Sequence, residues 1–215
     1  AEWPGMDGET FREAVESEKA TELNRLGSEK LLVALTDASL DRESVLSAAA
    51  DSEYAAAETF RTWADDEPTE PAREAFEAVH EQEREHYERV VAHLSDHDSP
   101  DSAGPMHAYL RGLDGAVERV GAGLVGRPLV STRAHTQVIS FFVNEADTGM
   151  ADLFRDLKAE TGEELERGLE TLTALCEDED DWERARATAE YVVQVAYDDY
   201  ADSLEGLGIN PRPIC

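Results

Sequence analysis

Two stretches in the first half of the chain decide the fold: SVLSAAADSEYAAAETFRTWADDE at residues 44–67 and AFEAVHEQEREHYERVVAHL at residues 75–94. In both stretches apolar residues recur at steps of three and four, the spacing that places them on one face of an α-helix. The face of the first helix comprises Val45, Ala49, Glu53, Ala56, Phe60 and Trp63. The face of the second comprises Ala72, Phe76, Val79, Glu83, His86, Val90 and Leu94. Because burying an unpaired charge is costly, Glu53, Glu83 and His86 are the unusual feature of this sequence.

The helical period continues along nearly the whole chain, and the alternating pattern typical of β-strands is absent. The sequence therefore predicts an all-α fold. Prolines, glycines and polar turns divide it into helices at roughly 8–36, 41–66, 70–95, 105–126, 131–158, 160–178 and 181–206. No linker is visible, so residues 1–215 are expected to form a single helical domain.

Two helix boundaries decide which helices pair in the second half of the chain. The segment Gly126-Arg127-Pro128 is expected to turn the fourth helix into the fifth. Residues 131–178 form either two helices or one long helix kinked at Gly149 or Gly162.

The chain is strongly acidic, with 49 aspartate and glutamate residues against 19 lysine and arginine residues and a formal net charge of −30. A disordered acidic chain is short of apolar residues, whereas 41% of these residues are hydrophobic. The carboxylates occupy almost every polar position, which favours adaptation to concentrated salt, where screening limits self-repulsion. We therefore expect a protein from a halophile. No basic stripe could meet phosphates, so nucleic acid is not an expected partner.

Cysteine content and hydropathy indicate the compartment. Cys176 and Cys215 form neither a zinc pattern nor a disulfide framework. The first residues lack the basic start and apolar run of a signal peptide, and no apolar stretch is long enough to span a membrane. A cytoplasmic protein without membrane contact is expected.

Helix geometry brings the three unusual residues together. Glu53 lies about thirteen residues before the end of its helix, and Glu83 about thirteen residues after the start of the next. The helical segment between each glutamate and the connecting loop is then roughly 20 Å long, at about 1.5 Å per residue. A short loop makes the two helices antiparallel, so Glu53 and Glu83 should face each other at one level. Two carboxylates and an imidazole in a helical core require a counter-charge, and a Glu opposite Glu-x-x-His is half of a di-iron or di-manganese site.

At these residues the chain resembles the ferritin-like superfamily, and within it the rubrerythrin branch of di-iron carboxylate proteins. The resemblance covers about fifty residues. It implies an antiparallel four-helix bundle with a core at about 41–158 and additional terminal helices at about 8–36 and 160–206. Glu53 matches the ligand of the family's first helix, Glu83 its bridging carboxylate and His86 its terminal ligand.

The family pattern should repeat in the second half, where the match is weaker. Glu118 and Glu145 are the expected ligands there, and Asp114 is an alternative to Glu118. Thr148 stands where a second Glu-x-x-His would place its histidine. A different register would use 160–178 with Glu160 or Glu164, but the stripe Leu165, Leu169, Leu172 and Cys176 predicts that those glutamates face solvent.

The resemblance implies a carboxylate-bridged metal site that binds iron, with manganese as the alternative. Such a protein would be an oxidoreductase of ferroxidase or peroxidase type, acting in iron oxidation or peroxide handling. The chain lacks the paired Cys-x-x-Cys motifs of a rubredoxin module, so electrons would come from a separate donor. Family members commonly form homodimers. The competing interpretation is a metal-free helical scaffold or protein-interaction module, in which the degenerate site is only a buried polar network.

Overall fold

The computed structural model describes residues 6–212, and in them the chain forms helices joined by short loops, without a β-strand. The elements are α1 (Gly8–Glu18), α2 (Ala20–Leu26), α3 (Lys30–Leu35), α4 (Arg42–Asp66), α5 (Glu70–Val91), α6 (Gly104–Arg111), α7 (Ala116–Val120), the π-helix η1 (Gly121–Gly126), α8 (Arg127–Asn144), α9 (Thr148–Leu175) and α10 (Glu179–Gly206). The all-α prediction is confirmed. In this part of the chain no helix combines the length and apolarity that crossing a membrane requires.

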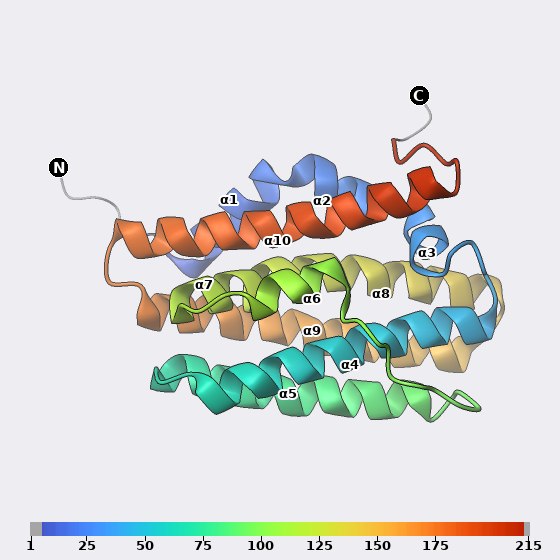
Figure 1. Ribbon diagram of the computed structural model, residues 1–215, viewed down its shortest axis with the longest axis horizontal. Helices are drawn as coiled ribbons and strands as arrows, with labels where there is room; N and C mark the ends of the chain where they lie inside the picture. The colour runs from blue at the N-terminus through green and yellow to red at the C-terminus, as the bar shows by residue number, and fades with distance from the viewer. Residues whose placement is uncertain (1–5, 213–215) are drawn as a thin grey trace.

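The first hairpin consists of α4 and α5, which pack along each other (Figure 1). Asp41 caps α4 by accepting a hydrogen bond from the Ser44 amide at 2.9 Å. Glu67 ends it in an extended conformation. Proline in the first turn of α5 fits there because the amide that it lacks has no partner inside the helix. Both helices therefore begin and end within a few residues of the predicted positions.

The second hairpin consists of α8 and α9, and its turn differs from the prediction. The break falls at 145–147, where Ala146 has a φ of 58° and Asp147 accepts a hydrogen bond from the Met150 amide at 3.1 Å. Gly149 lies in the first turn of α9 and Gly162 within α9. The expected helices 131–158 and 160–178 are thus replaced by one shorter and one longer helix.

The prediction of a turn at Gly126-Arg127-Pro128 is wrong. Gly126 is helical, with φ −61° and ψ −48°, and η1 runs directly into α8. Pro128 occupies the first turn of α8, where proline does not interrupt a helix. The predicted helix at 105–126 is divided into α6, α7 and η1. As a consequence the partner of the first hairpin is α8 with α9, and not 105–126 with 131–158.

A third layer consists of α10 together with α1, α2 and α3, which lie on the side of α8 and α9 away from α4 and α5 (Figure 1). α10 packs closely on η1. A Cβ at Gly126 would lie 2.6 Å from the Ala189 carbonyl oxygen, so only glycine allows this approach. The predicted long helix at 8–36 is broken into α1, α2 and α3 at Lys19 and near Gly27.

Candidate metal centre

Glu53 from α4 and Glu83 and His86 from α5 meet in the interior, as the sequence predicted. Their exposed fractions are 4%, 0% and 0%. The Nδ1 atom of His86 lies 3.6 Å from Oε2 of Glu53 and 3.9 Å from Oε2 of Glu83. Each of the three residues offers one possible metal-ligand atom, and these three atoms lie within 4.8 Å of one another.

The two nitrogens of His86 have different surroundings. Its Nε2 lies 2.7 Å from a carboxylate oxygen of Glu160 on α9, and the two form a hydrogen bond. Arg89 holds that carboxylate in place with two hydrogen bonds of 3.0 and 2.9 Å. Because a carboxylate only accepts, Nε2 carries the hydrogen, and in the neutral ring Nδ1 is then a bare lone pair.

This lone pair has no hydrogen-bond partner although it is buried. It points toward the carboxylates of Glu53 and Glu83, an arrangement that is repulsive unless a cation or a proton stands between them. Ligand atoms bound to one metal ion lie at most about 4.2 Å apart when each bond is about 2.1 Å long. The separations of 3.6 and 3.9 Å satisfy that limit. A metal-bound histidine typically donates its other N–H to a carboxylate, as His86 does to Glu160.

A second histidine supports Glu53 from the opposite hairpin. Nε2 of His135, on α8, lies 3.0 Å from Oε1 of Glu53 in a hydrogen bond. His135 is 5% exposed, so it is part of the buried interior. Its Nδ1 is also buried without a partner. His135 therefore fixes the orientation of the Glu53 carboxylate toward His86.

A buried guanidinium lies next to Glu83 on the remaining side of the site. Arg127 is 2% exposed, and one of its nitrogens lies 2.9 Å from Oε1 of Glu83 and forms a close ion pair with Glu164. Gln82 donates a hydrogen bond to the other oxygen of Glu164 at 2.8 Å. The contact with Glu83 is electrostatic, since neither oxygen of Glu83 has a hydrogen bond of suitable geometry. Arg127 thus lies where α5 and α9 would otherwise bring two carboxylates together.

The π-helix η1 explains how Arg127 reaches this place. In a π-helix the Gly123 carbonyl would accept from the amide five residues on, but that residue is Pro128, which has none. The Nε of Arg127 donates to this carbonyl instead, at 3.1 Å. The side chain is thereby held against the ring of Phe60, 5.1 Å from its centroid.

The charges do not balance. Glu53, Glu83 and Glu164 are buried, and Arg127 is the one buried guanidinium that contacts them among residues 6–212. Burial and the charge of Glu164 raise the pKa of Glu83 well above its ordinary value. Burial also acts to raise the pKa of Glu53, but its close contacts with Glu83, His135 and His86 outweigh it and hold that pKa well below its ordinary value. Burial acts to lower the pKa of His86, but its contacts with Glu53 outweigh burial and raise that pKa above its ordinary value. Without a metal, protons on Glu83 and His86 would offset part of the excess negative charge. A divalent cation would displace these protons and would offset more of the excess negative charge.

The ligands expected from the second half of the sequence lie elsewhere. Glu118, on α7, pairs with Arg184 of α10 at 3.2 Å. Glu145 is exposed at the end of α8, and Asp114 is exposed before α7. None of the three joins the cluster of Glu53, Glu83 and His86.

Four residues of the site were missed or assigned to solvent: Arg127, His135, Glu160 and Glu164. Glu164 is 1% exposed because α9 turns its Thr161, Glu164 and Gly168 side toward α5 and η1, beside the leucine stripe that the sequence showed. The spacing of three and four from Thr161 could have indicated this second buried face. Glu160 lies at its edge, where it can reach both His86 and Arg89.

Comparisons of the chain with known protein families, with curated proteins and with solved structures gave no match. What the site can do is therefore inferred from its own geometry and chemistry.

Proposed function

We propose that this protein is a ferritin-like four-helix bundle, built from α4, α5, α8 and α9, that binds one divalent transition-metal ion at Glu53, Glu83 and His86. Iron is the first candidate and manganese the second, because a mixed carboxylate and imidazole ligand set suits both. The ion would supply a redox-active Lewis acid for iron oxidation or peroxide handling. Electrons would come from a separate donor.

The orientation of His86 carries this proposal. Its Nε2 is committed to Glu160, and its unpartnered Nδ1 faces two buried carboxylates at 3.6 and 3.9 Å. A metal ion would use the lone pair of Nδ1 and offset the carboxylate charge at once. The orphaned oxygens of Glu83 would gain a partner by the same step.

Arg127 limits the proposal to one ion. A di-metal site places a second cation between the bridging glutamate and the carboxylates of the fourth helix. In this chain the guanidinium of Arg127 lies there, beside Glu83 and Glu164. Its fixed charge replaces a second metal, and no second histidine is then required.

Metal analysis tests the proposal. Protein prepared in high salt with iron or manganese should contain about one equivalent of metal. The Glu83→Gln variant, which keeps the shape and removes the charge, should retain less than a tenth of that amount. The Glu85→Gln variant is the matched control, since Glu85 is exposed on the same helix. Two equivalents, or equal metal content in all three proteins, would refute the single-ion site.

The contact of Arg127 with Glu83 and Glu164 also favours a second candidate, the metal-free scaffold. In that case the buried network would serve only to hold α5, α8 and α9 in register. The metal-free protein would then be fully stable, and added iron, manganese or zinc would leave its unfolding temperature unchanged. A rise in that temperature with metal, lost in Glu83→Gln, would exclude the scaffold.

A further inference from the structure

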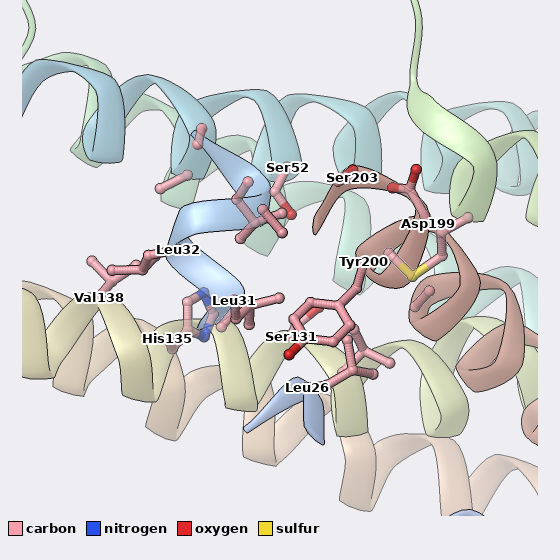
Figure 2. Close-up of a pocket in the computed structure, with 18 of the residues that line it drawn as sticks. Leu26, Leu31, Leu32, Ser52, Ser131, His135, Val138, Asp199, Tyr200 and Ser203 are labelled. Carbon is pink, nitrogen blue, oxygen red and sulfur yellow. The ribbon is translucent and has the colours of Figure 1, made fainter. Parts of the chain in front are cut away.

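A cavity of about 270 Å³ lies between α3, α4, α8 and α10, and it reaches the proposed metal site. Glu53 and His135, the hydrogen-bonded pair at one edge of that site, both line it. Figure 2 shows His135 beside Leu31, Leu32 and Val138, at some distance from Asp199 and Ser203. The cavity therefore has an end near the metal site and an end at α10.

The lining is mainly aliphatic. Its apolar members are Leu26, Leu31, Leu32, Ala34, Leu35, Val45, Ala48, Ala49, Met106, Val130, Ala134, Val138 and Ala196. Such a surface gains free energy when it is covered by hydrocarbon in place of water. An apolar cavity of about 150 Å³ is large enough for benzene, so this one has room for a longer, flexible chain.

The polar members of the lining restrict what the other end of the ligand can be. Asp199, Tyr200 and Ser203 belong to α10, and Ser131 of α8 lies beside the Tyr200 ring (Figure 2). Ser52 lies next to Glu53 in the sequence of α4. Burial and the nearby Asp202 raise the pKa of Asp199. The lining contains two carboxylates, those of Glu53 and Asp199, and no lysine or arginine. An anionic head group would meet repulsion here, whereas a hydroxyl group would find both donors and acceptors.

The cavity reaches the surface beside the short helix α3. Leu35 is 49% exposed and also lines the cavity. α3 has only six residues and follows a connection at Gly27. Leu35 and Asp199, which is also exposed, therefore mark where the cavity meets the surface.

We propose that this cavity binds an aliphatic molecule with an uncharged, hydroxyl-bearing end, of the class of medium-chain primary alcohols. The hydroxyl group lies beside Asp199 and Ser203 of α10, and the hydrocarbon end points toward Glu53 and His135. The role of this molecule as a reactant rests on the proposed metal site, but its binding does not. The cavity would thereby hold C–H bonds of the ligand close to the metal ion.

Binding to the metal-free protein is the first test. Titration calorimetry with 1-hexanol, 1-octanol and 1-decanol should show affinity rising by about fourfold per added methylene until the cavity is full. Octanoate and decanoate should bind at least tenfold more weakly than the alcohols of equal length. Equal binding of acid and alcohol, or no binding of any alcohol, would overturn the proposal.

Filling the cavity is the second test. Ala134→Leu and Ala49→Leu add a side chain from α8 and from α4 respectively, and each should weaken 1-octanol binding at least tenfold. Ala187→Leu, at an exposed position of α10, is the matched control and should bind like the parent protein. Unchanged binding in both cavity variants, with both shown to be folded by thermal unfolding, would contradict this location.

The third test separates this inference from the proposed function. In protein loaded with Mn²⁺, the NMR resonance of the terminal methyl group of bound 1-octanol should broaden more than that of its CH₂OH group, and Zn²⁺ should cause no such broadening. Stronger broadening of the CH₂OH group would overturn the orientation. If alcohols bind and no metal does, the proposed function fails while the cavity assignment stands. If metal binds and alcohols do not, only the cavity assignment fails.

Discussion

His86 shows at the scale of one residue how the fold could prepare a ligand. One nitrogen donates to Glu160, which Arg89 holds from the surface side, and the other faces Glu53 and Glu83. Hydrogen bonding to Glu160 sets the tautomer and raises the basicity of the free nitrogen. Hydrogen bonds from Arg89 and His86 overcome the effect of burial and hold the pKa of Glu160 below its ordinary value, so it stays an acceptor.

Removing the charge of Glu160 should therefore weaken metal binding without touching the ligands. We expect Glu160→Gln to lower the affinity for Mn²⁺ or Zn²⁺ by about 10–100-fold, as measured by competition with a chelator. Glu163→Gln, exposed on the same helix, should leave the affinity unchanged. An equal affinity in both variants would show that Glu160 does not position His86.

Arg127 should be needed for stability whether or not metal is present. Arg127→Met leaves Glu83 and Glu164 without their cation and should cost about 3–5 kcal/mol in the free energy of unfolding. Arg127→Met combined with Glu164→Gln should recover part of that loss, because one of the stranded charges is gone. Chemical denaturation of the parent, single and double variants measures both effects. Strictly additive losses would argue that the two residues are not coupled.

His107 should make the protein less stable in mild acid. Burial, together with the charges of Arg127 and Arg111, lowers the pKa of His107 to about 3. In the unfolded chain the pKa is about 6.5, so below that pH the unfolded state binds a proton that the folded state does not. His107 should therefore remove about 1.4 kcal/mol of stability per pH unit as the pH falls below about 6.5, and nothing above it.

Denaturant unfolding at pH 7.5 and pH 5.5 checks this expectation. The His107→Gln variant should lose less stability between these two values than the parent protein. His93→Gln is the control, because His93 is an exposed histidine outside the core. The same pH dependence in parent and His107→Gln would disprove the assignment.

At the scale of elements, sequence patterns predicted the first hairpin better than the second. The residues of α4 and α5 that face the core follow a single clean period, and Pro68 and Pro71 mark the turn. Around Arg127-Pro128 the same reasoning failed, because proline fits the first turn of a helix as well as it fits a break. That one error replaced α8 and α9, the actual partners of the first hairpin, by residues 105–126 and 131–158.

The missed site residues have a related cause. Glu164 lies beside the apolar stripe of α9, and its burial depends on a pairing with Arg127 that joins separate helices. Arg127 reaches it through the π-helix, which has no distinctive sequence pattern beyond its glycines. Side chains that are buried only because a distant partner compensates them cannot be found from the period of one helix.

The packing of η1 on α10 can be tested with a pair of glycine substitutions. Gly126→Ala would place a Cβ 2.6 Å from the Ala189 carbonyl oxygen and 2.3 Å from a methyl carbon of Val192, so we expect a loss of about 1–3 kcal/mol in stability. Gly162→Ala, within α9, meets nothing within 4 Å and should gain about 0.5–1 kcal/mol from helix propensity. A stabilising Gly126→Ala would mean that α10 is not held closely against η1.

At the scale of the whole molecule, the acidic residues divide into two groups. A few are buried with specific partners, as at Glu53, Glu83, Glu164 and Glu67. Most of the others are exposed or half-buried along the outer faces of the helices. The net charge of −30 therefore acts mainly as repulsion between surface carboxylates, which salt screens over about 3 Å at 1 M.

This repulsion predicts that concentrated salt stabilises the folded chain. Raising KCl from 0.1 to 2 M should increase the unfolding temperature by roughly 5–10 °C, equivalent to a few kcal/mol for a domain of this size. Changing the exposed residues Glu43, Glu85, Glu163 and Glu170 to glutamine lowers the net charge from −30 to −26 and should reduce this dependence on KCl. The variant should be the more stable protein at 0.1 M KCl and should approach the parent at 2 M, because screening removes the difference between them. If the unfolding temperature does not depend on KCl, or depends on it equally in both proteins, the acidic surface is not what adapts the protein to salt.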